Sequence, residues 1–367
     1  MDDLIDFLSS VIHFCERGDP LPVAFSKAKE IRRVRNVNYD ELFELSRKLI
    51  LSYYSLSGRS ARKKVISFLE GANKISLPQW MNDELRGLVD LEAYLRSLES
   101  GRYKWFRVNT VLGEENQVLT SLERQGIKFE RDGDFNYLFK VRSGNITKTD
   151  EFRNFKVIIQ DKASVAVVEA LKPEKGDVIF EFASAPGLKA ELIYELTQGD
   201  VYLILAELDR ERLTKEIKLL SRLGVDMGKV DFINQDSTMN SVLKADKVLI
   251  DAPCSSSGIL YNEPTVLLGL RDKGKVENFS VIQKLMIREA FNIRFKKAVY
   301  SVCSIFPEEG EAVMDEYMDH LLSTNAGGVE GYGNHGSGKF CNRYFGHIHG
   351  TEDFFIATLR GSESHER

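Results

Sequence analysis

Five short β-rich runs alternate with helical stretches through the second half of the chain. In order, they read DVIFEF, VYLILAE, VDFIN, KVLID and KAVYSV, and the helical stretches around them cover residues 187–198, 209–223 and 277–293. Strands this apolar need cover on both faces, which helices packed on a parallel sheet provide. The pattern predicts a doubly wound, Rossmann-like α/β sheet that ends in a last strand, DFFIATL. The Gly-, Asn- and His-rich stretch 327–350 before that strand predicts a long loop.

The first hundred residues show helical rather than strand periodicity. Leucines recur at helical spacing over residues 42–53 and again from Leu85 to Leu98, and they predict a helical domain over residues 1–100. Residues 101–155 then read as a strand, a short helix and two strands with a turn at Asp132-Gly133, which predicts a small α/β subdomain. The sheet described above fills a third domain, residues 156–361.

Composition limits where such a chain works and what it binds. The 367 residues include no apolar run of the roughly 20 that a membrane span needs, and the N-terminus lacks the pattern of a signal peptide. We therefore expect a soluble, cytoplasmic monomer with no membrane partner. The net charge of −5 argues weakly against nucleic acid, but residues 20–64 carry eleven basic and four acidic side chains, a local +7. This stretch is either a solvated helix face or a phosphate-binding surface.

The first strand of the sheet runs into a small-residue turn, FASAPGLK, that opens a helix. Its small side chains let a ligand approach the backbone, and the amides of the helix N-terminus favour an anionic group. The next strand ends at Glu207, where this fold commonly holds a ribose diol, and Asp236 follows the third strand. Both acids are also explained as ordinary helix N-caps. Neither GxGxxG nor a Walker motif occurs, which disfavours a dinucleotide or a nucleoside triphosphate.

Two cysteines follow the fourth and fifth strands. The fourth strand delivers Asp251 and Cys254 in DAPCSSSG, and the fifth delivers Cys303. If the strands are neighbours, their ends lie about 5 Å apart, so both thiols and the carboxylate face the same crevice as the turn. Cys15 and Cys341 are expected to be small buried hydrophobic residues. The four cysteines are too scattered for a disulfide framework, and no spacing indicates a metal site.

The blocks DAPCSSSG, SVCSIFPEEGE and ASAPGLK resemble the motifs of the RNA cytosine-carbon-5 methyltransferases, the Sun or Fmu family that includes bacterial RsmB. The strand start Arg107-Val108-Asn109, the block QDKAS at 160–164 and the run EDFFIA at 352–357 are also similar to that family. The likeness extends from about residue 78 to residue 360. The helical N-terminal part resembles, more weakly, the NusB-like RNA-binding domain of some members.

The resemblance implies an S-adenosylmethionine-dependent RNA (cytosine-5-)-methyltransferase, with ribosomal RNA as first and transfer RNA as second choice of substrate. It implies that Cys303 adds to carbon 6 of the base, that Asp251 holds the cytosine edge, that Cys254 assists release and that Lys189 supports the site. It implies a cofactor site made of Ala183, Ser184, Ala185, Pro186, Gly187, Lys189, Glu207, Asp236 and Asp251. It also assigns RNA binding to the helical domain and the small subdomain, with Phe106, Arg107 and Asn109 as a second RNA surface.

The cofactor turn, residues 181–190, departs from the family pattern Asp-x-Cys-Ala-Ala-Pro-Gly-Gly-Lys-Thr. This chain has Glu181, Ala183, Ser184, Leu188 and Ala190 at the varied positions, and Val302 replaces the usual Thr before the second thiol. Leu188 puts a side chain where the backbone is expected to approach the cofactor. The residues assigned to catalysis are present, so we expect an active enzyme. The alternative is a catalytically silent RNA-binding or assembly factor that retains the methyltransferase fold. Trp80 and Trp105 are expected to pack in the core.

Overall fold

The computed structural model describes residues 2–35, 37–100 and 103–361. Its contacts divide the chain into two units: a helical unit of the N-terminal residues up to 102 together with 255–277, and an α/β unit of 103–254 and 278 onward. This division differs from the boundaries expected from sequence in two respects. Residues 255–277 pack with the helices, and the small subdomain shares a unit with the large sheet. The expected boundary at residue 101 lies outside the described residues.

The helical unit is built on six α-helices of the described chain: α1 (Asp2–Glu16), α2 (Leu21–Ile31), α3 (Tyr39–Leu51), α4 (Ala61–Leu69), α5 (Gln79–Leu85) and α6 (Leu91–Ser100). Helix α1 contacts both α2 and α4. Their apolar faces form one core, which Leu268 joins from the 3₁₀ segment Pro264–Gly269. Trp80, on α5, is half-buried rather than part of this core, and its Nε1 donates to the carbonyl of Leu270 at 2.8 Å.

The leucine pattern from Leu85 to Leu98 does not form one continuous helix. Helix α5 ends at Leu85 and α6 begins at Leu91. Asp90 accepts a hydrogen bond from the backbone N–H of Ala93 at 3.0 Å, which satisfies an otherwise unpaired amide at the start of the new helix. The capping side chain of Asp90 therefore starts a new helix where the spacing of the leucines alone favours one continuous helix.

The α/β unit contains two sheets. The smaller has the order β2-β3-β1-β4 with antiparallel pairings, from strands β1 (Trp105–Val108), β2 (Lys128–Arg131), β3 (Leu138–Ser143) and β4 (Val157–Ile159). Helices α7 (Glu115–Arg124) and α8 (Asp150–Arg153) accompany it. Phe106 and Phe139 stack at its centre, with ring centroids 5.2 Å apart. The predicted strand, helix and two strands are thus present, and β4 adds a fourth strand beside β1.

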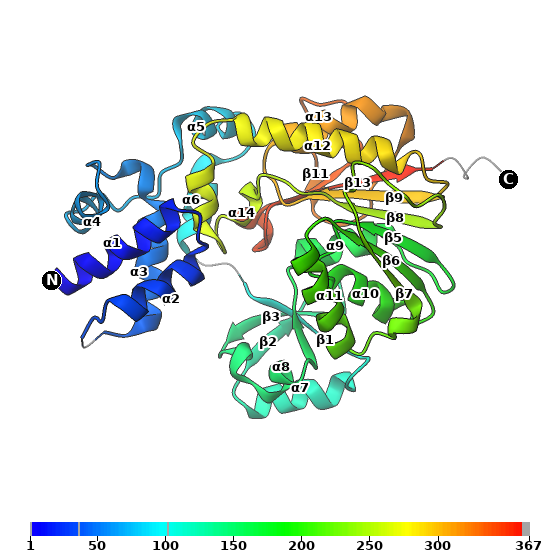
Figure 1. The fold of residues 1–367 in the computed structure, drawn as a ribbon, viewed down its shortest axis with the longest axis horizontal. Helices are drawn as coiled ribbons and strands as arrows, with labels where there is room; N and C mark the ends of the chain where they lie inside the picture. The colour runs from blue at the N-terminus through cyan, green and yellow to red at the C-terminus, as the bar shows by residue number, and fades with distance from the viewer. Residues whose placement is uncertain (1, 36, 101–102, 362–367) are drawn as a thin grey trace. The chain divides into compact units, whose positions relative to one another are not determined.

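The larger sheet contains the five expected strands: β5 (Val178–Phe182), β6 (Tyr202–Glu207), β7 (Val230–Asn234), β8 (Lys247–Asp251) and β9 (Lys297–Val302). They are parallel in the order β9-β8-β5-β6-β7. Helices α9 (Lys162–Leu171), α10 (Leu188–Leu196) and α11 (Arg210–Arg222) cover one face, and α12 (Gly274–Ala290) and α13 (Glu311–Met314) cover the other (Figure 1). The doubly wound, Rossmann-like prediction is confirmed.

The C-terminal part corrects one expectation. The last strand, β13 (Phe354–Arg360), runs antiparallel to β9 and also pairs with β10 (Leu321–Leu322). The stretch 327–350 is not simply a loop, because it contains β11 (Val329–Glu330), β12 (Asn342–Tyr344) and α14 (Gly346–His349). β12 pairs with β13 and buries Tyr344. Tertiary pairing with an existing sheet edge explains strands that the glycine-rich composition does not indicate.

Within the described part of the chain, the longest and most apolar helices fall short of what crossing a bilayer requires.

Candidate functional site

Strand β5 lies at the centre of the parallel sheet, between β6 and β8. The chain leaves β5 toward β6 on one side and reaches β8 later on the other, so the strand order reverses there. In open α/β sheets, ligands bind at the carboxyl ends of the strands at such a switch point. The turn after β5, the acids after β6 and β7 and the two cysteine segments after β8 and β9 all begin at this edge.

The turn after β5 holds backbone conformations that small residues favour. Ala183 has φ 53° and Gly187 has φ 93°, and α10 begins at the next residue, Leu188. A Cβ built on Gly187 would lie 3.1 Å from the side chain of Glu216 and 3.2 Å from that of Leu220. Glycine is therefore required here both by its φ angle and by close packing against α11.

Glu207, at the end of β6, lies at the ribose position expected for this fold. It is 3% exposed, and its Oε1 accepts from the backbone N–H of Asp209 at 3.0 Å. It is not the N-cap of α11, because Asp209 fills that position and accepts from the N–H groups of Glu211 and Arg212. Glu207 Oε2 is buried and has no hydrogen-bond partner, although Arg212 Nη1 lies 3.3 Å away. This geometry favours a ligand-binding role over the capping alternative.

Asp236 behaves differently. Its Oδ1 accepts from the N–H of Thr238 at 2.9 Å and from the hydroxyl of the same residue at 2.7 Å. The carboxylate is half-buried and already stabilises a local turn. Its cofactor role stays a prediction.

The two cysteines after β8 and β9 lie side by side. β8 and β9 pair in parallel, with Asp251 opposite Ser301, and the Sγ atoms of Cys254 and Cys303 are 3.2 Å apart. Neither is disulfide-bonded. Cys303 is half-buried and Cys254 is buried. The expectation that these strands bring both thiols to one place is confirmed.

A half-buried ion pair lies near these thiols. Lys189 Nζ lies 2.5 Å from Asp251 Oδ2, and the Ser301 hydroxyl donates to Asp251 Oδ1 at 2.6 Å. Burial by itself lowers the pKa of Lys189, but the charges of Asp251, Glu181 and Cys303 outweigh it, so the pKa of Lys189 is raised. Lys189 is therefore a cation at neutral pH. A fixed positive charge near a thiol favours its thiolate form.

The structure also shows residues that support the thiol segments and that the sequence analysis did not single out. Gln283, on α12, donates through Nε2 to the carbonyl of Pro253 at 2.9 Å and to Glu309 Oε1 at 3.3 Å. Arg343, fully buried on β12, donates to the carbonyl of Ser304 at 2.9 Å and pairs with Glu311 Oε2 at 2.5 Å. These polar residues lie far from the motifs in sequence, and no local pattern identifies them.

The prediction that Phe106, Arg107 and Asn109 form a second RNA surface is wrong. Phe106, Arg107 and Asn109 are each fully buried. Asn109 Nδ2 donates to the carbonyl of Leu223 at 2.9 Å. Arg107 pairs with Glu191 and Glu195 on α10 and donates to the carbonyl of Leu188 at 3.3 Å. Arg107 joins the small sheet to α10 and Asn109 joins it to the end of α11, whereas Phe106 packs within the small subdomain. The desolvated arginine is satisfied within the protein.

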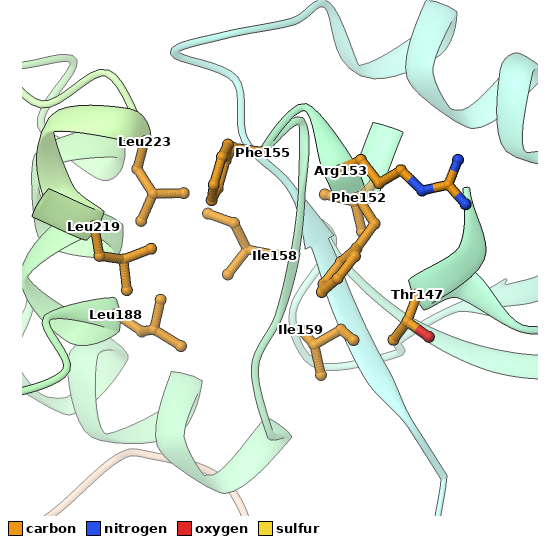
Figure 2. A pocket seen from close by; sticks show the side chains of 10 residues that line it. Thr147, Phe152, Arg153, Phe155, Ile158, Ile159, Leu188, Leu219 and Leu223 are labelled. Atoms are coloured by element: carbon orange, nitrogen blue, oxygen red, sulfur yellow. The ribbon is translucent and has the colours of Figure 1, made fainter. Parts of the chain in front are cut away.

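Leu188 is directed away from the turn. It lines an apolar cavity of about 450 Å³ with Leu219 and Leu223 of α11 and with residues of the small subdomain, including Phe155 and Ile158. Figure 2 shows Leu188, Leu219 and Leu223 on one side of this cavity, facing Phe155 and Ile158. The side chain that replaces the family glycine therefore packs between the two parts of the α/β unit.

The remaining cysteines and Trp105 match the packing expectation. Cys15 is buried, and burial together with nearby carboxylates raises the pKa of its thiol to about 12. Burial likewise raises the pKa of Cys341. Trp105 is 3% exposed and donates to the carbonyl of Gly350 at 3.1 Å. Among the described residues, no cluster of His, Cys, Asp and Glu side chains is arranged to bind a metal ion.

The basic stretch of the helical unit is partly neutralised by the acidic N-terminus. Arg62 pairs with Asp2 and Asp6, and Lys64 Nζ lies 2.6 Å from Glu16 Oε1. Other basic side chains of this stretch are exposed and form no ion pair within the described chain: Arg32, Arg33, Arg35, Arg59 and Lys63. The charge excess counted from sequence is thus reduced to a smaller set of cations.

Comparison with known proteins places this geometry in a family. The family model described as "16S rRNA methyltransferase RsmB/F" matches residues 168–360, which include the turn, both thiols, Asp251 and Lys189. The chain belongs to this RsmB/F family. A 26S rRNA (cytosine-C(5))-methyltransferase, nsun-5 of Caenorhabditis elegans, is 26% identical over 81% of this chain and 70% of its own length. Ribosomal RNA small subunit methyltransferase B of Proteus mirabilis is 25% identical over 66% and 59%, respectively.

Other RsmB/F relatives are longer than this chain. The 25S rRNA (cytosine-C(5))-methyltransferase nop2 of Schizosaccharomyces pombe is 28% identical over 76% of this chain, and the match spans 49% of the relative. Among solved structures, that of PH0851 aligns with a TM-score of 0.82 at 19% identity over 98% of this chain and 99% of its own. A methyltransferase homolog from Pyrococcus horikoshii aligns with a TM-score of 0.67 at 25% identity over 85% and 98%. These likenesses support the fold over nearly the whole chain.

Proposed function

We propose that this protein transfers a methyl group from S-adenosylmethionine to carbon 5 of a cytosine in RNA, with ribosomal RNA the favoured substrate and transfer RNA the second choice. The observation that carries the proposal is the pair of thiols, Cys254 and Cys303, 3.2 Å apart beside the Lys189–Asp251 ion pair. The family and the relatives named above are described as ribosomal RNA methyltransferases, which supports the choice of substrate.

S-adenosylmethionine supplies an electrophilic methyl group when bound. The residues that would hold it are those of the turn 183–187, with Glu207 on the ribose and Asp236 near the adenine. Buried carboxyl oxygens without a hydrogen-bond partner, Glu181 Oε2 and Glu207 Oε2, support the fit. A ribose diol offers donors and the sulfonium and ammonium groups offer positive charge, which are the partners that buried carboxyl oxygens lack.

Carbon 5 of cytosine is a poor nucleophile, so the chain must first activate the ring. In this proposal the Cys303 thiolate adds to carbon 6, forming an S–C bond and leaving carbon 5 as the nucleophilic end of an enamine. Lys189, held as a cation by Asp251, favours the thiolate. Asp251 accepts from the amino group of the cytosine, and a proton held between Asp251 and N3 stabilises the negative charge that develops on N3 as the thiolate adds. The base reaches these groups only if it is single-stranded or flipped out.

After methyl transfer the adduct must be resolved. The proton leaves carbon 5, its bonding electrons restore the double bond to carbon 6, and Cys303 departs as a thiolate. Cys254 assists this release, and its position 3.2 Å from Cys303 Sγ supports that role. Gln283 holds the backbone of the Cys254 segment through the Pro253 carbonyl, which keeps the two thiols at a fixed separation.

The test uses the full chain, tritiated S-adenosylmethionine and total RNA. Cys254→Ala should accumulate a covalent protein–RNA adduct, because addition proceeds while release stalls, and Cys303→Ala should form none. Cys341→Ala, which removes a buried thiol elsewhere in the same unit, is the matched control and should behave as the native protein. Reversed behaviour of the first two variants would place the nucleophile on the other strand. No donor binding and no 5-methylcytosine would favour a silent RNA-binding factor.

A further inference from the structure

Helix α11 supports the cofactor turn through three side chains spaced four residues apart. Arg212 Nη2 donates to the carbonyl of Ala185 at 2.7 Å, and Glu216 Oε2 accepts from the Ser184 hydroxyl at 3.0 Å. Leu220 packs against Gly187. Residues four apart share one face of a helix, so a single face of α11 contacts Ser184, Ala185 and Gly187 of the turn.

Glu216 is the residue of this face that has a buried carboxyl oxygen without a hydrogen-bond partner. The residue is 1% exposed, and its Oε1 is buried without a hydrogen-bond partner. That same atom lies close to the backbone of Gly187, because a Cβ built there would be 3.1 Å from it. An ionised carboxylate is costly in such a place unless each oxygen is hydrogen-bonded or paired with a positive charge.

The hydrogen-bond donors around Ser184 fit a protonated Glu216. The Ser184 hydroxyl has one proton but two acceptors within reach, Glu216 Oε2 at 3.0 Å and the carbonyl of Ala206 at 3.3 Å. If Glu216 is neutral, its own O–H donates to Ser184 Oγ and the serine proton goes to Ala206. If Glu216 is ionised, the serine proton turns to Glu216, and the Ala206 carbonyl keeps the backbone N–H of Ser184 at 2.9 Å. Both states can therefore form without moving the backbone.

The charged groups around Glu216 come from each packed element. Glu207 at the end of β6 disfavours its ionisation, whereas Arg212, one turn earlier on α11, favours it. Glu216 in turn contributes to the raised pKa of Glu181 on β5, where burial is the largest cause. Burial is the largest effect and, with Glu207, raises the pKa of Glu216 to about 7 despite the Ser184 hydrogen bond. A positive charge added at the turn would shift this balance toward the carboxylate.

We propose that Glu216 is a positioning residue that couples cofactor binding to the loss of one proton: it is neutral in the free protein and ionised when S-adenosylmethionine lies on the turn. The inference rests on the proposed function. On binding, the Glu216 O–H bond breaks, the proton goes to solvent, and the Ser184 hydroxyl reorients to Glu216 Oε2. The cofactor carries two positive groups, the sulfonium and the ammonium, against one carboxylate, and this excess of positive charge favours the ionised Glu216, which in turn holds Ser184 and the turn in place.

The test is calorimetric titration of the native protein and of Glu216→Gln with S-adenosylmethionine, without RNA, in buffers of different ionisation enthalpy. For the native protein, affinity should fall about tenfold from about pH 8 to about pH 6, with proton release on binding. Glu216→Gln, which keeps the shape but cannot ionise, should lose that share of the pH dependence and of the proton release. The amino group of the ligand titrates equally in both proteins and cancels in the comparison.

Two further variants separate a proton-linked role from a merely structural one. Ser184→Ala removes the donor that favours the carboxylate, so the midpoint of the pH dependence should move to higher pH. Glu211→Gln, an exposed position on the same helix, should match the native protein. Equal pH dependence in the native protein and Glu216→Gln would overturn this inference and leave the proposed function standing. A native protein that binds no S-adenosylmethionine would overturn both.

Discussion

Replacing Arg107 tests whether the arginine of the Arg-x-Asn motif is a structural residue. Its guanidinium donates to Gln160 Oε1 at 2.7 Å, lies 2.5 Å from Glu195 Oε2 and contacts Glu191. The side chains of Arg107 and Glu191 are fully buried. Removing one partner of a buried ion pair costs about 3 to 5 kcal/mol, because the other charge is left uncompensated. We expect Arg107→Ala to lower the free energy of unfolding of the α/β unit by this amount.

The assay can report on the α/β unit alone. The chain has two tryptophans: Trp105 lies in β1, two residues before Arg107, whereas Trp80 lies in the helical unit. In a Trp80→Phe background, the fluorescence of Trp105 follows urea unfolding of the α/β unit. With an m-value of about 2 kcal/mol/M, the midpoint should fall by roughly 1.5 to 2.5 M. Arg153→Ala, an exposed arginine paired with exposed Asp150, is the matched control and should cost less than about 1 kcal/mol.

The unfolding free energy lost in Arg107→Ala should depend on pH and on the ionisation of Glu191. Burial raises the pKa of Glu191 and Arg107 opposes that rise, so removing the arginine raises the folded-state pKa further. An acid with a raised folded-state pKa is destabilising as pH increases through the range between its unfolded and folded pKa values. The stability lost in Arg107→Ala should therefore be smaller at about pH 5 than at about pH 8. Adding Glu191→Gln to Arg107→Ala should recover part of that loss. A loss below about 1 kcal/mol that does not change with pH would refute the buried-charge argument.

Three further outcomes follow from the same geometry. Iodoacetamide at neutral pH should label half-buried Cys303 well before Cys15 or Cys341, whose pKa values are raised; mass mapping that finds equal rates would contradict this. Leu188→Gly should lower stability by about 1 to 3 kcal/mol, because it enlarges the apolar cavity and places a glycine in α10. It should not tighten S-adenosylmethionine binding in calorimetry, and a clear gain in affinity would show that the leucine obstructs the turn. Replacing Arg32, Arg33 and Arg35 together by Ala should reduce the slope of log affinity for RNA against log salt concentration by up to about 2. Arg62→Ala should leave this slope nearly unchanged and lower the stability of the helical unit, because its charge is already paired with Asp2 and Asp6.

Local pattern predicted most of the strands and the meeting of the two thiols. Each of the five strands occurs where its apolar run predicts it, and the order of β8 and β9 confirms that the two thiols are neighbours. Strand placement follows from side-chain periodicity, which is a local property. The expectations for Cys15, Cys341 and Trp105 as packing residues rest on the same kind of information, since residue type alone biases burial.

Long-range contacts decided the rest. Arg107 and Asn109 read as RNA contacts, but the fold buries both. The short strands β11 and β12 form in a glycine-rich stretch because a sheet edge was available to pair with. The basic stretch of residues 20–64 loses part of its charge to acids from α1.

The sequence by itself determined the fold class, the strand ends and the residue types that carry the chemistry, because these depend on local periodicity and motif. Only the tertiary structure decided which polar side chains became desolvated and which charges found partners. Glu216 is the clearest case: nothing in its sequence neighbourhood distinguishes it from an exposed helix residue, yet it is buried against Ser184 and Gly187. Its pKa is set first by burial and then by groups that folding brings around it, which are Ser184 in the turn, Glu207 at the end of β6 and Arg212 on α11.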